Sequence, residues 1–288
     1  MNRCHPLFML KKYAAPVALS MASLMCVPPS AGAQGTVADQ LTGKLVITGA
    51  STLAPLIAEI GKRFESLYPR VRIDVQSGGS SRGVADARQG LADIGMVSRA
   101  MKEDERDLSA FPVARDGVCP ILHQENPIQA LTDEQVVAIY TGKITNWKTV
   151  GGTDAPITVV NKADGRSTLE VFLQYFKLKN VDVKAQVVIG DNEQGVKTVA
   201  GNRNAIGYVS IGTAEYDATH GVPIKLLPIG GVAASTESVG KGIFPLSRPL
   251  HIVTRTPPVG LAKAFIEYAQ SKAVHDLIRQ QYFVPLAD

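Results

Sequence analysis

The sequence predicts an α/β fold in which strands alternate with helices. Three segments repeat one pattern: a short apolar run typical of a buried strand, a turn of small polar residues, and then apolar residues at helical spacing. Because strands that alternate with helices form the units of α/β proteins, this repetition predicts a largely parallel sheet. The chain has 288 residues, of which 45% are hydrophobic and 19% charged, a composition typical of a globular protein with one or two domains.

Each repeat is bounded by its own sequence signals. In the strands, β-branched and other apolar residues dominate, and in the second strand they alternate with polar ones. The turns contain glycine, serine and threonine, which favour a break before a helix. In the helices, apolar residues recur at intervals of three and four, which places them on one face. The strands are expected at 45–48, 71–76 and 157–160, the turns at 49–52, 77–83 and 161–167, and the helices at 53–67, 84–91 and 169–176.

The pattern changes between the second and third repeats. Residues 134–140 predict a short helix, the segment TGKITNWKTVGG follows it, and a domain boundary is expected near Cys119. No low-complexity linker separates the halves of the chain, so we expect two lobes that pack on each other and are joined by short crossovers. Later strands are expected at 205–211 and 250–254, and later helices at 261–270 and 273–281.

Residues 1–33 are typical of a secretory signal peptide. A basic stretch that ends in Lys11 and Lys12 precedes an apolar run over 13–27, and small residues lead to a cleavage site expected after Ala33. A membrane span would need about 20 uninterrupted apolar residues, and this run is shorter and contains prolines and serines. The sequence therefore predicts a periplasmic or secreted protein, with a polar leader at 34–40.

Removal of the signal peptide changes the charge and the cysteine content. The formal charge of +4 falls to +1, because the signal contains three cations and no acid. A body of this charge has no electrostatic basis for binding a polyanion, and this argues against nucleic acid as a partner. Cys4 and Cys26 leave with the signal, so Cys119 remains alone and no intramolecular disulfide is expected.

The turns of the three repeats favour an anion site. Each lies where a strand leads into a helix, and the first N–H groups of a helix have no acceptor within it. Ser and Thr are also ordinary N-caps, so a single turn would fit a purely structural role; three such turns with cations beside them favour binding. The candidate hydroxyl donors are Ser51, Thr52, Ser80, Ser81, Ser98, Ser167 and Thr168, and the candidate cations are Arg82, Arg99, Lys162 and Arg166.

Asp164 in the third turn has two interpretations. Its carboxylate is a candidate acceptor for a ligand proton, or it bonds its own backbone as turn aspartates do. Trp147 likewise fits either a binding platform or core packing.

Enzyme signatures are missing from the sequence. No GxxxxGK[ST] loop occurs, Ser210 lacks the first glycine of a nucleophile elbow, and Ser238 with Lys241 has the S-x-x-K spacing without the motifs that accompany it. The histidines are scattered without metal-ligand spacing. We therefore expect no catalysis, no metal site and no cofactor.

Several segments together resemble the periplasmic phosphate-binding proteins of ABC importers, the PstS-like family. They are ITGASTLAPL, QSGGSSRGVADARQGLADIGMVSR, YTGKITNWKTVGG, NKADGRSTLEVF, NAIGYVSIG and FPLSRPL, and they cover nearly all of the mature chain. The resemblance implies the type II periplasmic binding protein fold, with a ligand cleft between two α/β lobes that close about crossover strands. Lobe one would comprise 41–118 plus 250–288, and lobe two 119–249.

The resemblance also implies a function and a set of ligand contacts. The protein would capture inorganic phosphate as a monomer and pass it to a membrane ABC permease. Alternatives are another oxyanion such as sulfate or molybdate, or a secreted hydrolase of phosphoesters. Ser98 stands where larger family members have an aspartate that accepts the phosphate proton, and Lys162 where many have arginine. The contacts implied by position are Ser51, Thr52, Leu53, Ser80, Ser98, Arg99, Lys162, Arg166, Ser167 and Thr168.

Overall fold

The computed structural model of the protein describes residues 41–286. The predicted signal peptide, with Cys4 and Cys26, and the predicted leader fall outside the described residues. Within this range no helix is long and apolar enough to cross a membrane.

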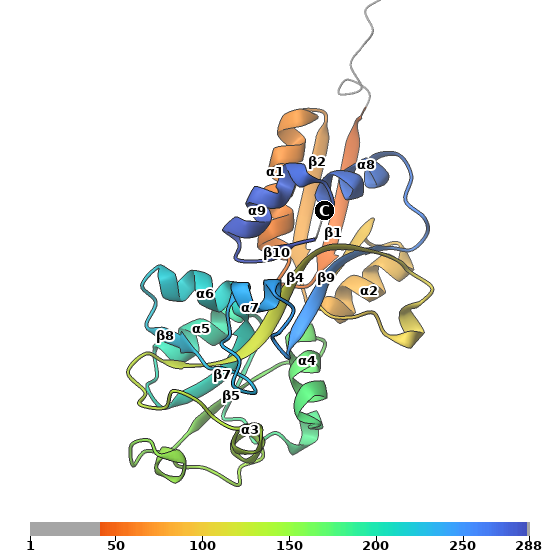
Figure 1. Ribbon diagram of the computed structural model, residues 1–288. Coiled ribbons are helices and arrows are strands. Elements are labelled where there is room, and N and C mark those ends of the chain that lie inside the picture. The colour runs from red at the N-terminus through yellow and green to blue at the C-terminus, as the bar shows by residue number, and fades with distance from the viewer. Residues whose placement is uncertain (1–40, 287–288) are drawn as a thin grey trace, which may run out of the picture. The chain divides into compact units, whose positions relative to one another are not determined.

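Ten strands form a mixed sheet that is covered by helices (Figure 1). The strands are β1 Gly43–Gly49, β2 Val71–Ser77, β3 Ile94–Val97, β4 Ser109–His123, β5 Thr158–Lys162, β6 Val187–Ile189, β7 Ala205–Ser210, β8 Ile224–Leu226, β9 Ser247–Thr254 and β10 Val284–Pro285. Their order is β2-β1-β3-β9-β4-β7-β5-β6, and β8 and β10 pair with β4.

Nine α-helices and several 3-10 turns lie among these strands of the described chain. The helices are α1 Ala54–Leu67, α2 Ser80–Gln89, α3 Asp133–Tyr140, α4 Ser167–Phe176, α5 Asn192–Ala200, α6 Ile211–Thr219, α7 Thr236–Gly240, α8 Gly260–Ala269 and α9 His275–Gln280, and the 3-10 turns are η2 Glu103–Glu105, η3 Trp147–Val150, η4 Asn180–Asp182 and η5 Lys272–Val274. All three predicted repeats are confirmed as β1–α1, β2–α2 and β5–α4.

The first lobe is built on a parallel set of strands. β1 lies between β2 and β3 and pairs with both in parallel. The apolar stripe of α1 packs onto this sheet, and Leu56, Ile60 and Phe64 are almost completely buried there. Phe64 also meets Phe265 of α8 edge to face, with ring centroids 5.4 Å apart. Burial of these side chains stabilises the helix more than its propensity does.

The second lobe has its own hydrophobic core. β5 pairs in parallel with β6 and β7, and the rings of Phe172 on α4 and Tyr208 on β7 stack with centroids 3.8 Å apart. Trp147 is fully buried in this core and donates its indole N–H to the carbonyl of Asn204 at 3.0 Å. Trp147 is therefore a packing residue and not an exposed binding platform.

Two antiparallel strands connect the cores. β4 pairs with β9 over residues 109–117 and then with β7 over residues 118–122. Figure 1 shows β4 and β9 running from one lobe into the other. Cys119 lies inside β4 and is fully buried, close to the point where β4 changes partner from β9 to β7. Burial raises the pKa of the Cys119 thiol well above its ordinary value, and this keeps the thiol protonated and unreactive.

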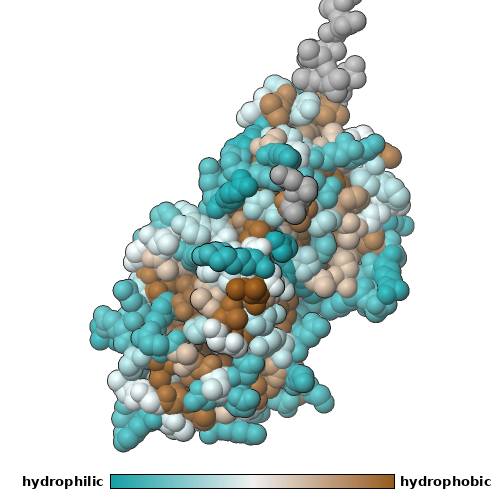
Figure 2. All heavy atoms as spheres, viewed as in Figure 1, coloured by the Kyte–Doolittle hydropathy of each residue, from teal (hydrophilic) through white to brown (hydrophobic). Residues whose placement is uncertain are grey.

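The surface is mixed in character. On the face seen in Figure 2, hydrophilic residues cover much of both lobes and hydrophobic residues appear in separate patches. The exposed large hydrophobic side chains come from distant elements, and they include Leu67, Leu91, Val181, Val188, Tyr216, Ile243 and Val259. Scattered apolar residues of this kind are normal on a protein surface.

Candidate anion-binding site

Three strand-to-helix turns, one from each repeat, meet at a single pocket. The turns before α1 and α2 belong to the first lobe, and the turn before α4 belongs to the second. The pocket has a cavity volume of about 10 Å³ and is lined by Ala50, Ser51, Thr52, Gly79, Ser80, Ser98, Lys162, Arg166, Ser167, Thr168 and Gly190. Residues far apart in sequence thus face one small cavity between the lobes.

The close approach of the lobes depends on glycine in the second turn. Gly79 has φ +99°, and a Cβ at this position would lie 2.6 Å from the carbonyl oxygen of Gly165 in the other lobe. The neighbouring N–H of Ser81 donates to that same carbonyl at 3.3 Å. Because only glycine combines this φ with the space available, a larger residue at position 79 would hold the lobes apart.

The helices that begin at the pocket have no side-chain N-caps. No side-chain cap hydrogen bond is found at the start of α1, α2 or α4, whereas α3, α5, α6 and α7 are capped by a side-chain oxygen. The C-terminal helices α8 and α9, which do not line the pocket, also lack such a cap. The first N–H groups of the three pocket helices therefore have no side-chain acceptor, although the Ser81 N–H in the first turn of α2 donates to the Gly165 carbonyl. An anion in the pocket would supply an acceptor and also interact favourably with the helix dipoles.

Three serine hydroxyls form a buried cluster against the pocket. The Ser80 hydroxyl donates to the Oγ of Ser167 at 2.9 Å and accepts the backbone N–H of Ser98 at 3.1 Å. The Oγ atoms of Ser98 and Ser167 lie 2.5 Å apart, and either can donate. These serines are almost fully buried, so their hydroxyls bond to one another across the two lobes instead of capping helices.

Two cationic side chains supply positive charge to the pocket. Lys162, at the end of β5, is only 2% exposed, and burial together with the positive charges of Arg248 and Arg166 lowers its pKa to about 7, against a smaller opposing effect of Asp191. Arg166 precedes α4 and is half-buried. None of the lining residues is acidic. The pocket therefore combines buried positive charge with hydrogen-bond donors, which is an arrangement suited to an oxyanion.

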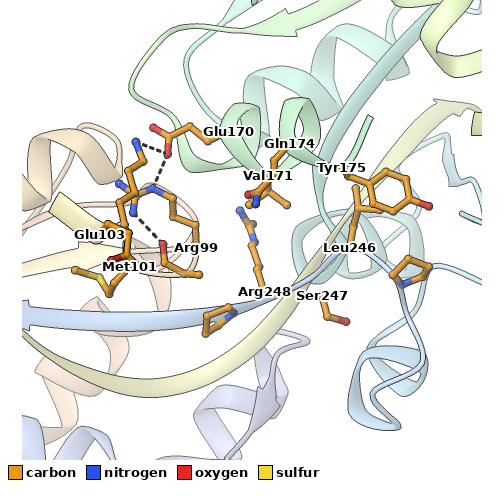
Figure 3. Close-up of a pocket in the computed structure, with 14 residues that line it drawn as sticks. Arg99, Met101, Glu103, Glu170, Val171, Gln174, Tyr175, Leu246, Ser247 and Arg248 are labelled. Atoms are coloured by element: carbon orange, nitrogen blue, oxygen red, sulfur yellow. Dashed lines mark hydrogen bonds and ion pairs between the residues drawn. The ribbon is translucent and has the colours of Figure 1, made fainter. Parts of the chain in front are cut away.

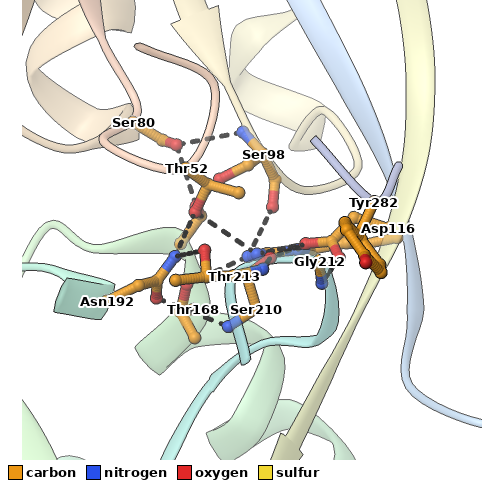
Figure 4. A network of polar contacts seen from close by, with 12 residues as sticks. Thr52, Ser80, Ser98, Asp116, Thr168, Asn192, Ser210, Gly212, Thr213 and Tyr282 are labelled. Carbon is orange, nitrogen blue, oxygen red and sulfur yellow. Dashed lines mark hydrogen bonds and ion pairs between the residues drawn. The ribbon is translucent and has the colours of Figure 1, made fainter. Parts of the chain in front are cut away.

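A buried ion pair lies directly behind the pocket. Arg248 on β9 and Asp116 on β4 are register partners in the sheet, and their side chains are each 1% exposed and 2.7 Å apart. Figure 4 shows the network that they anchor. The Asp116 carboxylate also accepts the Ser210 hydroxyl and the backbone N–H of Gly212, so it is fully occupied within the protein.

A larger groove lies beside the pocket and is crossed by an ion-pair cluster (Figure 3). Arg99 of the first lobe forms a bidentate pair with Glu105, with both distances 2.7 Å, and its Nε lies 2.5 Å from Glu170 on α4 of the second lobe. Lys102 reaches the same Glu170 oxygen at 3.1 Å. Hydrogen bonding to Arg99 lowers the pKa of Glu105 despite its burial. This cluster ties the two lobes together at the edge of the groove.

The structure brings eight of the eleven predicted site residues to the pocket. The remaining three lie elsewhere: Leu53 is completely buried in the first core, Arg99 is held by Glu105 and Glu170, and Asp164 is exposed and accepts a bond from the Asn180 amide at 2.8 Å. Those that line the pocket are Ser51, Thr52, Ser80, Ser98, Lys162, Arg166, Ser167 and Thr168.

No spacing pattern in the sequence indicates the residues behind the pocket. Arg248 lies between Pro245 and Pro249, Asp116 lies within a long strand, and Asn192 begins a helix that follows a strand of only three residues. Arg248 was visible only as part of the segment FPLSRPL. Among residues 41–286, no group of three or more His, Cys, Asp or Glu side chains could hold a metal ion.

Comparison with known proteins identifies a family that shares this architecture. Residues 29–273 match the family model described as the PBP superfamily domain. The phosphate-binding protein PstS of Bacillus subtilis is 27% identical over 97% of this chain and 96% of its own length. A Clostridium perfringens protein described as a phosphate ABC transporter substrate-binding protein, solved with bound phosphate, is 31% identical, with a TM-score of 0.79 over 85% of this chain and 100% of that one.

A second solved structure gives the same result. An ABC-type phosphate transport receptor from Vibrio cholerae is 29% identical, with a TM-score of 0.70 over 84% of this chain and 100% of that one. The predicted two-lobe binding-protein fold is thereby confirmed. The chain belongs to the PBP superfamily and, within it, to the PstS-like family.

Proposed function

We propose that this protein captures inorganic phosphate in the pocket between its lobes and delivers it to a membrane ABC permease. The observation that carries the proposal is the convergence of three uncapped helix N-termini on one cavity that contains hydroxyls, two cations and no acid. The names of the relatives, two of which are phosphate transport proteins with solved structures, support the same ligand.

The number of donors in the pocket is sufficient for tight binding. A hydrogen bond to a charged group contributes about 1.5–3 kcal/mol net, and micromolar affinity corresponds to about 8 kcal/mol. Six hydroxyl side chains and two cations line the cavity, and three helices begin beside it. Half a dozen of these donors would therefore exceed that value after the entropy of association is offset.

The same geometry supports closure of the lobes over the ligand. We propose that lobe one, 41–118 plus 250–288, and lobe two, 119–249, move about β4 and β9, the two strands that pass between them. The contacts between Ser80 and Ser167 and between Arg99 and Glu170 join the lobes in the arrangement described here. Opening would break these contacts and admit the anion.

One observation favours a second candidate ligand. No carboxylate lines the pocket, so nothing in it would repel an oxyanion that carries no proton. Sulfate is such an ion, whereas phosphate at neutral pH still carries hydrogen. Selection of phosphate in this pocket would depend on hydroxyl or carbonyl oxygens as acceptors for that hydrogen.

We propose no catalytic role and no cofactor. A serine nucleophile needs a base beside it, and the pocket serines bond only to one another and to backbone within the described residues. The signal-like N-terminus and the extracytoplasmic family support a periplasmic or secreted location, and we propose that the protein acts there as a monomer.

Calorimetric titration of the phosphate-stripped mature chain tests the proposal. One phosphate per chain should bind with micromolar or tighter affinity, and sulfate and molybdate are the comparison ligands. A chromogenic phosphoester, incubated with and without Zn²⁺ or Mg²⁺, should remain intact. Binding of sulfate alone would reassign the ligand, and hydrolysis would replace the binding role with an enzymatic one.

A further inference from the structure

Arg248 directs all of its N–H groups to partners on both sides of the pocket. Its Nε and Nη2 donate to Asp116 at 3.0 and 2.7 Å. The second Nη2 hydrogen reaches the Thr52 hydroxyl at 3.3 Å, and Nη1 donates to the Thr168 hydroxyl at 3.0 Å and to the Ser98 carbonyl at 3.1 Å. A guanidinium has five N–H donors and no acceptor, so this side chain is fully satisfied without any ligand.

This donor-only partner constrains two hydroxyl groups, Thr52 fully and Thr168 at one of its two acceptor sites. The Thr52 oxygen accepts from Arg248 and also from the Asn192 amide at 3.1 Å. Since a hydroxyl oxygen has two acceptor sites and one hydrogen, Thr52 can only donate to a third partner. Neither Thr52 nor Thr168 donates its hydroxyl to another side chain or carbonyl of the described chain, and both line the pocket.

We propose that Arg248 is a positioning residue for anion binding, which holds the Thr52 and Thr168 hydroxyls as donors directed into the pocket. Thr52 belongs to the first lobe and Thr168 to the second, so the donor set is complete only when the lobes are together. Asp116 holds the guanidinium in place from β4, the strand that joins the lobes. Arg248 thereby restricts which ligand atoms fit: only an acceptor oxygen can face the Thr52 hydroxyl, whereas the Thr168 oxygen keeps one acceptor site beside its hydrogen.

The inference rests on the proposed phosphate site, and a double-mutant cycle tests it. Arg248→Lys keeps the charge and removes the planar fork of donors. We expect it to raise the dissociation constant for inorganic phosphate by about tenfold or more, since the Thr52 and Thr168 hydroxyls lose the guanidinium donors that orient them. In a Thr52→Val, Thr168→Val background, the same change should raise the constant less than about threefold, because its targets are gone.

Controls separate this role from a general effect on the fold. Arg115→Lys, next to Asp116 on the same strand, alters an arginine that bonds only to the carbonyl of Gly240, and phosphate affinity should not change. If Arg248→Lys does not fold, the neutral pair Asp116→Asn with Arg248→Gln takes its place, because it leaves no unpaired buried charge. Circular dichroism and ligand-free melting establish that each variant is folded.

The outcomes are distinct. The inference is supported if Arg248→Lys weakens phosphate binding more in the wild-type background than in the Thr52→Val, Thr168→Val background. Equal fold-changes for Arg248→Lys in both backgrounds, or no change in either, would overturn it while the phosphate site stands. Failure of the unmodified protein to bind phosphate would instead overturn the proposed function on which the inference rests.

Discussion

Replacing Lys162 by Met is expected to abolish a proton uptake that accompanies phosphate binding. In the ligand-free protein, burial and the neighbouring cations Arg248 and Arg166 lower the pKa of Lys162 from 10.5 to about 7, while Asp191 acts in the opposite sense. At pH 8 the amine is therefore about nine-tenths neutral. A bound dianion beside it favours the ammonium form and raises its pKa.

The magnitude follows from that occupancy. Binding at pH 8 should take up as much as about 0.9 proton per phosphate. Calorimetry in buffers of different ionisation enthalpy measures this number as a slope, and the slope should fall close to zero in Lys162→Met. The variant should also bind more weakly by about 1.5–3 kcal/mol, because a charged donor is lost.

The sign of the pH dependence gives a second check. Between about pH 7 and 10.5, Lys162 holds more protons in the unfolded chain than in the ligand-free native protein. The free energy of unfolding of the ligand-free protein should therefore rise with pH through this window. Phosphate binding needs the proton, so affinity should weaken over the same window. A wild-type slope of zero at pH 8, or a slope that Lys162→Met leaves unchanged, would refute the assignment of this proton to Lys162.

Further predictions concern the other groups around the pocket. Ser80→Ala should weaken phosphate binding by about 1–3 kcal/mol in calorimetry without loss of fold; unchanged affinity would make Ser80 a structural residue only. Glu170→Gln removes the interlobe pair with Arg99 and should speed phosphate release up to about fivefold in stopped-flow measurements at low salt. An unchanged rate would mean that this pair does not hold the lobes closed over the ligand. Ser98→Asp introduces a carboxylate and should raise the preference for phosphate over sulfate at least about tenfold in competition assays; a ratio that stays the same would mean that this side chain does not face the ligand. Asp164→Asn should leave that ratio unchanged, because Asp164 is exposed and bonded to Asn180, and a marked shift would bring Asp164 to the ligand.

The repeats were predictable because their signals are local. The strand expected at 45–48 is β1 Gly43–Gly49, and the helix expected at 53–67 is α1 Ala54–Leu67. Hydrophobic periodicity and turn composition act over a few residues, and burial of one face then makes the pattern visible in the sequence. Seven of the eight pocket residues lie in these repeats, so they could be predicted with the elements that carry them, and Ser98 follows the next strand, β3.

The strands between the lobes were less visible. Over residues 118–123 every side chain of β4 is buried, so the alternation that reveals a strand is lost, and a boundary was expected near Cys119. The strand was expected to begin at Leu250, because Pro249 is typical of a break. In the structure β9 begins at Ser247. Pro249 is tolerated since β9 pairs only with β4 at that point and meets β3 from His251 onward.

The roles of Arg99 and Arg248 depend on partners far away in the chain. Glu170, which holds Arg99, follows it by 71 residues, and Asp116 precedes Arg248 by 132 residues. Such pairings follow from the sheet order and from the contact of the lobes, and neither can be derived from residue spacing. The sequence could therefore predict cations near the turns but not which of them faces the pocket.

A crystal structure of the phosphate-stripped protein, grown after addition of phosphate, tests the central claim most directly. We predict density for one tetrahedral anion between the N-termini of α1, α2 and α4, within hydrogen-bond distance of Thr52, Ser80, Ser167 and the Lys162 amine. An empty pocket with phosphate bound elsewhere, or an anion held only by exposed side chains, would contradict the claim that these three turns form the binding site.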